Sequence, residues 1–222
     1  MRKGLIKTKS EEYVNSEIRL RSITVIGLGS VGCKMLEYIY RKGLTDLHYL
    51  MYYADMDRYY ENSSFADEIY MDPHGLIGGS GKIGRGLDAF RRMVQKQEET
   101  IKKVIPDDTK LLIVVAAMGG ITGTGAAPVV AEIAKSITDD NAKTKMYVAA
   151  VVTMPFLFEG LHIRRYAEEG LQELKKHVDS ITIIDNEEVF KKFPGTSRLK
   201  VFSKVDEMVF EAIKSMIETF KG

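Results

Sequence analysis

The chain has 222 residues, of which 45% are hydrophobic and 28% are charged, and its formal net charge is +1 at pH 7. This length and composition fit one globular α/β domain or two small ones, and the near-neutral charge offers no electrostatic basis for binding nucleic acid. The sequence predicts no transmembrane segment, since no run of ~18 apolar residues occurs. Its single cysteine excludes an internal disulfide and fits a reducing, cytoplasmic setting.

Strand-like and helix-like segments alternate along the chain. Apolar runs predict strands over 22–26, 47–53, 111–116, 146–152 and 180–184. Helical periodicity predicts helices over 31–42, 85–104, 126–137, 163–177 and 201–220, with Pro128 in the first turn of the third helix and 57–81 irregular. This alternation predicts an α/β fold of the Rossmann-like type, in which helices cover both faces of a parallel sheet.

The first predicted strand runs into a glycine-rich turn, GLGSVG at 27–32, which we call the first loop. It is a literal GxGxxG between a strand and a helix, and Asp55 follows Gly32 by 23 residues, at the end of the second strand. Dinucleotide-binding enzymes place an acid there to bind the ribose hydroxyls, so this feature alone favours NAD. Glycines that serve only a tight turn are the alternative.

A further glycine stretch, GLIGGSG at 75–81, contains Gly78 and Gly79 and precedes the helix predicted over 85–104. By itself it fits a flexible surface loop as well as it fits a phosphate contact.

The stretch MGGITGTGAAP at 118–128 lies between an apolar strand and a helix, and we call its residues 118–125 the second loop. Glycines let backbone N–H groups approach an anion, and the free N–H groups and dipole of a helix N-terminus attract negative charge. The loop lacks the lysine of a P-loop, and a dinucleotide-binding domain needs no second loop of this kind. Together the loops predict a polyphosphate ligand held from two sides.

Three blocks of the chain resemble the tubulin/FtsZ superfamily, and FtsZ in particular. They are MGGITGTGAAPVVAEIAK at 118–135, AVVTMPFLFEG at 150–160 and AEEGLQELKKHVD at 167–179, and the likeness extends over about residues 20–220. It implies that residues 1–20 are an N-terminal extension, 21–198 the nucleotide-binding domain and 199–222 a closing helix. The implied ligand is GTP or GDP, with Mg²⁺ as an accompanying ion, and the implied role is cytoskeletal or related to cell division.

The resemblance also implies a set of binding residues. The first loop and its helix contribute Gly29, Ser30, Gly32 and Cys33, Asp55 lies near the nucleotide, and Gly78 and Gly79 approach the γ-phosphate. The second loop contributes Gly119, Gly120, Ile121, Thr122, Gly123, Thr124 and Gly125, while Pro155 and Glu159 shape the ribose site and Asn186, Phe202 and Asp206 bind the guanine.

The chemistry of guanine supports the last pair separately. A carboxylate accepts two hydrogen bonds from N1–H and the exocyclic amine of guanine, whereas adenine offers no such donor pair. Phe202 and Asp206 are four residues apart and share one face of a helix. A core phenylalanine beside a solvated surface acid is the alternative.

The chain departs from the FtsZ pattern at several positions. Ser30, Val31, Cys33 and Lys34 replace small or amide residues of the first loop. Lys34 either adds a positive charge at the diphosphate or is a surface residue of the helix. Asp185 stands where FtsZ-like sequences carry proline in a Pro-Asn-Asp segment. The family's arginine near the γ-phosphate aligns with Ile163, so Arg164 or Arg165 is the candidate for that role.

A second departure concerns catalysis. FtsZ follows its central helix with a loop whose two acids complete the next subunit's site, and no such loop follows residues 201–220 here. We therefore expect nucleotide binding with slow hydrolysis, or hydrolysis that depends on a homo-oligomer or an FtsZ-type partner.

Overall fold

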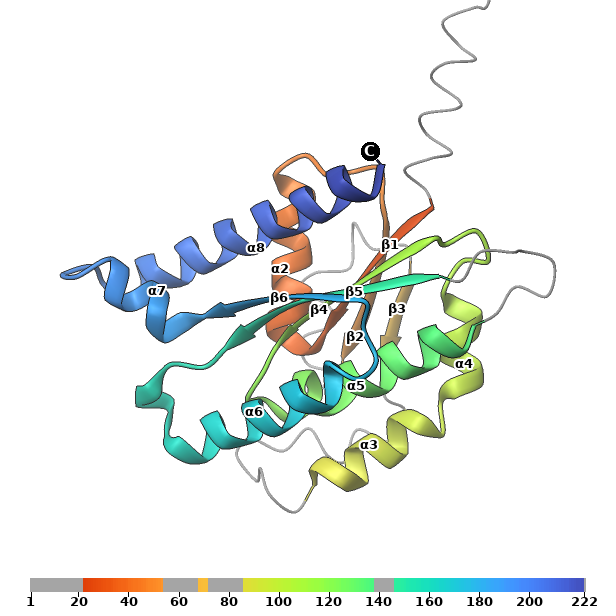
Figure 1. The fold of residues 1–222 in the computed structure, drawn as a ribbon, viewed down its shortest axis with the longest axis horizontal. Helices are drawn as coiled ribbons and strands as arrows, with labels where there is room; N and C mark the ends of the chain where they lie inside the picture. Colours follow the sequence, from red (N-terminus) through yellow and green to blue (C-terminus); the bar gives the residue numbers. More distant parts are fainter. Residues whose placement is uncertain (1–21, 54–67, 72–85, 138–145, 222) are drawn as a thin grey trace, which may run out of the picture.

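The computed structural model describes residues 22–53, 68–71, 86–137 and 146–221. Its centre is a six-stranded sheet with the strand order β3-β2-β1-β4-β5-β6, in which every neighbouring pair is parallel (Figure 1). The strands are β1 (Ile23–Leu28), β2 (His48–Tyr53), β3 (Glu68–Met71), β4 (Leu111–Ala117), β5 (Tyr147–Met154) and β6 (Ser180–Asp185). The predicted parallel α/β architecture is confirmed.

Helices cover both faces of the sheet, as Figure 1 shows. One face carries α3 (Leu87–Gln95), α4 (Glu98–Val104), α5 (Ile121–Ser136) and α6 (Leu161–Leu174), and the other carries α2 (Gly29–Arg41), α7 (Asn186–Lys192) and α8 (Arg198–Lys221). A short 3₁₀ helix, η2 (Leu157–Glu159), connects β5 to α6.

Two hydrophobic cores result, one on each side of the sheet. Successive residues of a strand point to opposite faces, so Leu112 and Val114 of β4 belong to the core under α5, while Ile113 and Val115 belong to the core under α2 and α8. Central strands of this kind are buried on both faces, which explains why their sequences are continuous apolar runs rather than alternating ones.

Four details differ from the sequence prediction. Strand β3 lies inside the stretch 57–81 that was expected to be irregular, and the helix expected over 85–104 is two helices, α3 and α4. Helix α5 begins at Ile121, so Pro128 lies inside the helix and not in its first turn. Helix α7 was not predicted. The glycines at 123 and 125 lower helix propensity, which is why the start of α5 was misplaced.

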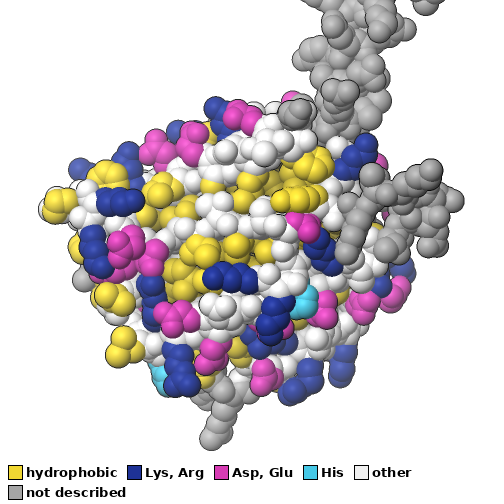
Figure 2. Space-filling model, in the orientation of Figure 1, with side chains coloured by type: hydrophobic (Ala, Val, Ile, Leu, Met, Phe, Trp, Pro, Cys, Tyr) yellow, Lys and Arg dark blue, Asp and Glu magenta, His cyan; other side chains and the backbone are white. Residues whose placement is uncertain are grey.

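A groove of about 480 Å³ lies between the second half of α8 and the first residues of β4, β5 and β6. Its lining includes Leu111, Tyr147, Met216 and Phe220. Figure 2 shows hydrophobic side chains gathered on this side of the molecule, beneath α8. The groove is at the amino ends of the strands, the opposite edge of the sheet from the two glycine loops. In the described part of the chain, no helix combines the length and the apolar character that crossing a bilayer requires.

Candidate nucleotide-binding site

The two glycine loops adjoin at the carboxyl edge of the sheet. Strands β1 and β4 are neighbours, and the helices that follow them, α2 and α5, pack on opposite faces. This is the point of a parallel sheet at which ligands bind, because the diverging connections leave a crevice outside the strand ends. A Cβ atom built on Gly29 would lie 3.2 Å from Thr122 Cβ and 3.6 Å from the backbone nitrogen of Gly123. The sequence-based expectation that both loops face one ligand therefore agrees with their placement.

The glycines of the first loop have distinct physical tasks. Gly29 has a φ of +74°, a backbone conformation that residues other than glycine rarely adopt. A Cβ on Gly32 would lie 2.6 Å from the carbonyl oxygen of Val115, so only glycine lets α2 rest this closely on β4. Helix α2 has no side-chain cap and no acid in its first turn, which leaves its first N–H groups available to an anion.

The side chains that follow the first loop differ in direction. The Cys33 side chain is fully buried, its thiol donates to the carbonyl oxygen of Gly27 at 3.3 Å, and burial raises the pKa of this thiol to about 12. Only the backbone of Cys33 is thus available at the crevice. Ser30 is half-buried, and Lys34 is exposed.

The second loop is closed by its own hydrogen bond. The Gly119 N–H donates to Thr124 Oγ1 at 2.7 Å, and Thr124 is buried. The Thr124 hydroxyl accepts this bond and so holds the loop, which leaves its O–H donor outside this bond, while Thr122 is half-buried beside Gly29. Gly120 is the N-cap residue of α5, it offers the helix no side-chain cap, and it is exposed.

Two other glycines of this segment serve packing. A Cβ on Gly123 would lie 2.2 Å from the carbonyl oxygen of Ala117, so this glycine lets α5 start directly above the end of β4. A Cβ on Gly125 would lie 2.7 Å from Phe90 Cδ1, so Gly125 allows α3 to approach α5. Ile121, the first residue of α5, is half-buried.

The residues expected at the base come from α7 and α8. Asn186 is buried, and its Oδ1 atom has no hydrogen-bond partner among the described residues. Phe202 is 45% exposed and makes an edge-to-face contact with the buried Phe156 at a centroid distance of 5.2 Å. Phe156 also contacts Phe190 of α7 at 6.3 Å, so it joins the start of α8 to α7.

Asp206 is half-buried on the same helix as Phe202, and burial raises the pKa of its carboxyl. Within the described residues it forms no hydrogen bond or ion pair. Phe202 is thus not a core phenylalanine and Asp206 is not fully solvated, and the interpretation of the two as a base-binding pair stays a prediction.

The segment between β5 and α6 is tied together by hydrogen bonds. Pro155 is buried, and its carbonyl oxygen accepts from Arg164 Nη1 at 2.9 Å. Glu159 Oε1 accepts from the Phe156 N–H at 2.8 Å. One carboxylate oxygen of Glu159, the residue predicted to bind the ribose, therefore stabilises the segment between β5 and α6.

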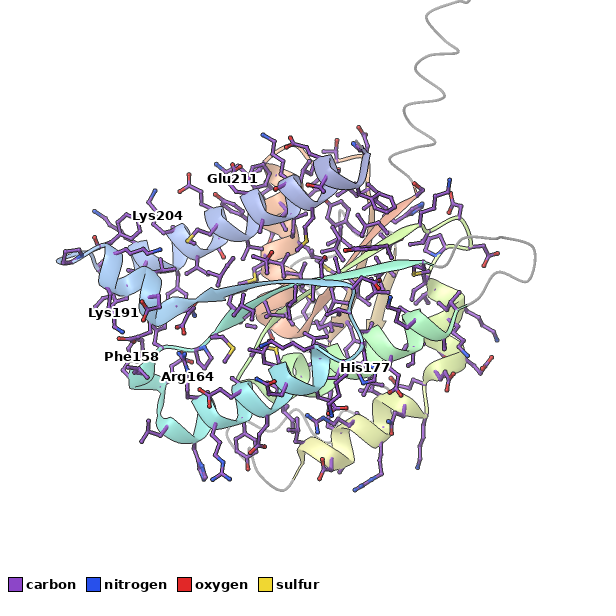
Figure 3. All side chains as sticks on the ribbon, in the orientation of Figure 1. Phe158, Arg164, His177, Lys191, Lys204 and Glu211 are labelled. Atoms are coloured by element: carbon purple, nitrogen blue, oxygen red, sulfur yellow. The ribbon has the colours of Figure 1, made fainter. Side chains whose placement is uncertain are left out.

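Arg164 pairs with an acid in this structure. Both terminal nitrogens of its guanidinium donate to the carboxylate of Asp185. Figure 3 shows Arg164 on α6, at the same end of the molecule as Phe158. Arg165 has a side chain that is 77% exposed and pairs with Glu169 at 3.3 Å. Sequence reasoning named Asp185 only as a departure from the FtsZ pattern and missed both its capping role and Phe156, although an aspartate directly before a helix is a recognisable capping signal.

Three of the expected site residues, Asp55, Gly78 and Gly79, lie outside the described residues. Within the described ranges, no group of three or more His, Cys, Asp or Glu side chains gathers as a metal site would require.

The fold and the two adjoining loops define a class of protein, the α/β domains that hold a phosphate-bearing ligand at the carboxyl edge of a parallel sheet. Residues 22–193 match the model of the tubulin/FtsZ family, GTPase domain. The chain belongs to this family, as the sequence resemblance implied.

Individual relatives agree with this assignment. The chain is 33% identical over 202 residues to cell division protein FtsZ 1 of Methanocaldococcus jannaschii, and the match covers 88% of this chain and 51% of that protein. It is 30% identical over 197 residues to FtsZ of Porphyromonas gingivalis, with 88% and 41% covered. The chain thus spans about half the length of the curated relatives it matches.

Solved structures give the same result. An empty FtsZ dimer from M. jannaschii superposes with a TM-score of 0.76 at 30% identity, covering 95% of this chain and 59% of that one. A GTPγS-bound protofilament of CetZ2 from Haloferax volcanii shares the fold, with a TM-score of 0.71 at 17% identity and 88% and 57% covered. An NAD-binding Rossmann protein, the alternative suggested by the first loop, is not favoured by these matches.

Proposed function

We propose that the chain binds GTP or GDP in the crevice between the first and second loops. The observation that carries this proposal is the close approach of Gly29 to Thr122 and Gly123, where two uncapped helix N-termini converge. Neither helix has an acidic residue in its first turn, so backbone N–H groups and two helix dipoles together provide a site for a polyphosphate.

We assign the guanine to Asn186, Phe202 and Asp206. The buried Oδ1 of Asn186 has no donor among the described residues, and guanine offers N–H donors that would satisfy it. The unpaired carboxylate of Asp206 matches the donor pair of guanine, and the exposed ring of Phe202 offers a stacking surface. Pro155 and Glu159 flank the ribose in this assignment, with Glu159 Oε2 toward a hydroxyl.

We further propose that hydrolysis is slow, or depends on a partner. Phosphoryl transfer needs a positioned water and charge stabilisation, and a Mg²⁺ ion bound with the nucleotide would supply part of that stabilisation. The described residues at the two helix N-termini include no acid to orient that water. An FtsZ-type partner that carries such an acid would supply it, consistent with a cytoskeletal or division-related role in the cytoplasm.

The test is identification and titration of the bound nucleotide. The purified protein is denatured, the released nucleotide is identified by chromatography, and GTP, ATP and NAD are then titrated by calorimetry. We expect guanine nucleotide to be released and GTP to bind at least tenfold more tightly than ATP, since unpaired polar groups penalise the wrong base by roughly that factor or more. Release of NAD would contradict the proposal.

The base assignment has its own test in Asp206→Asn. This substitution replaces one acceptor by a donor that faces the guanine amine, so we expect the affinity for GTP to fall by roughly 10- to 100-fold. Glu207→Gln is the matched control, because Glu207 is exposed and pairs with Lys204 at 2.8 Å. Equal GTP affinities of the two variants would refute the role of Asp206 but not the phosphate crevice.

A further inference from the structure

Arg164 links three separate segments near the base-binding residues. Its Nη1 donates to Asp185 Oδ1 at 3.0 Å and to the Pro155 carbonyl oxygen at 2.9 Å, and its Nη2 donates to Asp185 Oδ2. The side chains of Arg164 and Asp185 are only 20% and 24% exposed. A planar guanidinium held on a carboxylate by two hydrogen bonds has its direction fixed, unlike a lysine. The two terminal nitrogens are therefore committed to Asp185 and Pro155, and Nε pairs with Glu168 Oε1 at 3.5 Å.

Asp185 has a second task in the same position. Its Oδ1 accepts the Glu187 N–H at 3.0 Å and so caps the N-terminus of α7. Burial would raise the pKa of this carboxyl, but the hydrogen bonds from Arg164 and from the start of α7 outweigh burial and lower the pKa. The carboxylate thus stays ionised and holds the first turn of α7 against α6.

The residue fixed by this cap is Asn186. It follows Asp185 directly, it is the first residue of α7, and it carries the buried Oδ1 that has no partner. The Leu157 N–H also donates to Glu187 at 3.1 Å, which ties the other side of the same turn to the segment after β5. An unpaired amide oxygen is costly when buried, and a ligand donor satisfies it only if the backbone holds it in place.

At position 185 this chain has aspartate where the FtsZ pattern has proline, and the Arg164–Asp185 pair restrains the backbone in place of the proline ring. Proline fixes φ near −65°, and Asp185 adopts a φ of −85° without a ring. Here two ionic hydrogen bonds and a helix cap restrain the backbone that a proline ring would restrain covalently.

We propose that Arg164 and Asp185 are positioning residues that fix Asn186 for the base, and that Arg164 is not the phosphate ligand. This inference rests on the proposed function. It predicts that substitution of Arg164 weakens contacts to the base and not to the γ-phosphate. The affinities for GTP and GDP should therefore fall by the same factor.

The experiment is a double-substitution cycle on nucleotide affinity. GTP and GDP are titrated into the parent protein, Arg164→Met, Asn186→Ala and the double variant, with folding checked by circular dichroism. We expect Arg164→Met to lower the affinities for GTP and GDP by roughly tenfold. In the Asn186→Ala background the same substitution should cause no further loss of affinity, because the effects of coupled residues are not additive. Lys176→Met, which removes an exposed pair with Glu173 at 2.6 Å, is the control and should bind as the parent does.

The possible results separate cleanly. A loss confined to GTP would make Arg164 a γ-phosphate ligand, and losses that add would make it a general structural residue; either result overturns the inference. Failure of the parent to bind GTP would instead remove the proposed function. If Arg164→Met does not fold, Arg164→Lys replaces it, since it keeps the charge but loses the two-point geometry, and an affinity equal to the parent's would overturn the inference.

Discussion

At the scale of single residues, backbone conformation matters as much as side-chain chemistry. Gly119 has a φ of +106°, and a Cβ there would lie 2.7 Å from Ile163 Cγ2, whereas nothing lies within 4 Å of a Cβ on Gly120, whose φ is −80°. Neighbouring glycines of one loop thus differ sharply in what a methyl group would meet.

Gly119→Ala should lower the free energy of unfolding by about 1–3 kcal/mol, because alanine at this φ is strained. Gly120→Ala is the matched control and should change the free energy of unfolding by less than about 0.5 kcal/mol. Urea denaturation followed by circular dichroism measures both. Equal effects of the two substitutions would contradict the different environments described for these glycines.

Asp206 gives a pH dependence with a definite sign. Burial raises the pKa of this carboxyl in the folded protein above that of the unfolded chain, which is about 3.9. The folded state therefore binds the proton more tightly, and the free energy of unfolding of the nucleotide-free protein falls as the pH rises through the raised pKa.

Asp206→Asn removes this contribution, so the nucleotide-free variant should be more stable than the parent at pH 7 although it binds GTP more weakly. Urea titrations at several pH values from 4 to 8 measure the difference. A variant that is less stable than the parent at pH 7 would show that Asp206 has a stabilising partner.

At the scale of elements, Phe156 is the contact that joins α7 and α8 to the segment after β5. It is fully buried and touches Phe158, Phe190 and Phe202 at centroid distances of 4.8, 6.3 and 5.2 Å. Phe158 is 48% exposed and stacks on Phe156 from the solvent side. One ring therefore contacts residues of both helices that carry the proposed base-binding residues.

Phe156→Leu should reduce the free energy of unfolding by about 1–2 kcal/mol through lost packing and lost ring contacts. It should also lower the affinity for GTP. Phe158→Leu is the control of equal size and should cost less than half as much, since its ring is already half in water. Thermal unfolding and calorimetric titration give the two quantities. A larger effect at 158 than at 156 would contradict the central place of Phe156.

The elements also show how far the sequence can predict this protein. Strand β4 is apolar throughout and β5 nearly so, and both their existence and the parallel sheet could therefore be predicted from pattern alone. The start of α5 could not, because Gly123 and Gly125 are retained for close approach to Ala117 and Phe90 at the expense of helix propensity. The Arg164–Asp185 pair could not be predicted either, because it joins residues 21 positions apart through tertiary packing.

At the scale of the whole molecule, the nucleotide-binding crevice and the apolar groove beneath α8 lie at opposite edges of the sheet. We expect GTP turnover per chain to stay on the order of 10⁻³ s⁻¹ or below at every concentration of the protein alone. Phosphate release measured over a hundredfold range of concentration, with light scattering for filaments, checks this. Turnover that rises steeply with concentration would show that copies of this chain complete each other's sites.

The contact between Gly32 and the Val115 carbonyl has a thermodynamic consequence. It sets α2 directly on the strand that leads into the second loop, so the two glycine loops are coupled through this backbone contact. A ligand that enters such a crevice has little protein left to order, and a preorganised site binds with a small entropic penalty. We therefore expect the calorimetric heat-capacity change on nucleotide binding to be small, as for burial of the ligand alone, rather than the large negative value that accompanies coupled folding.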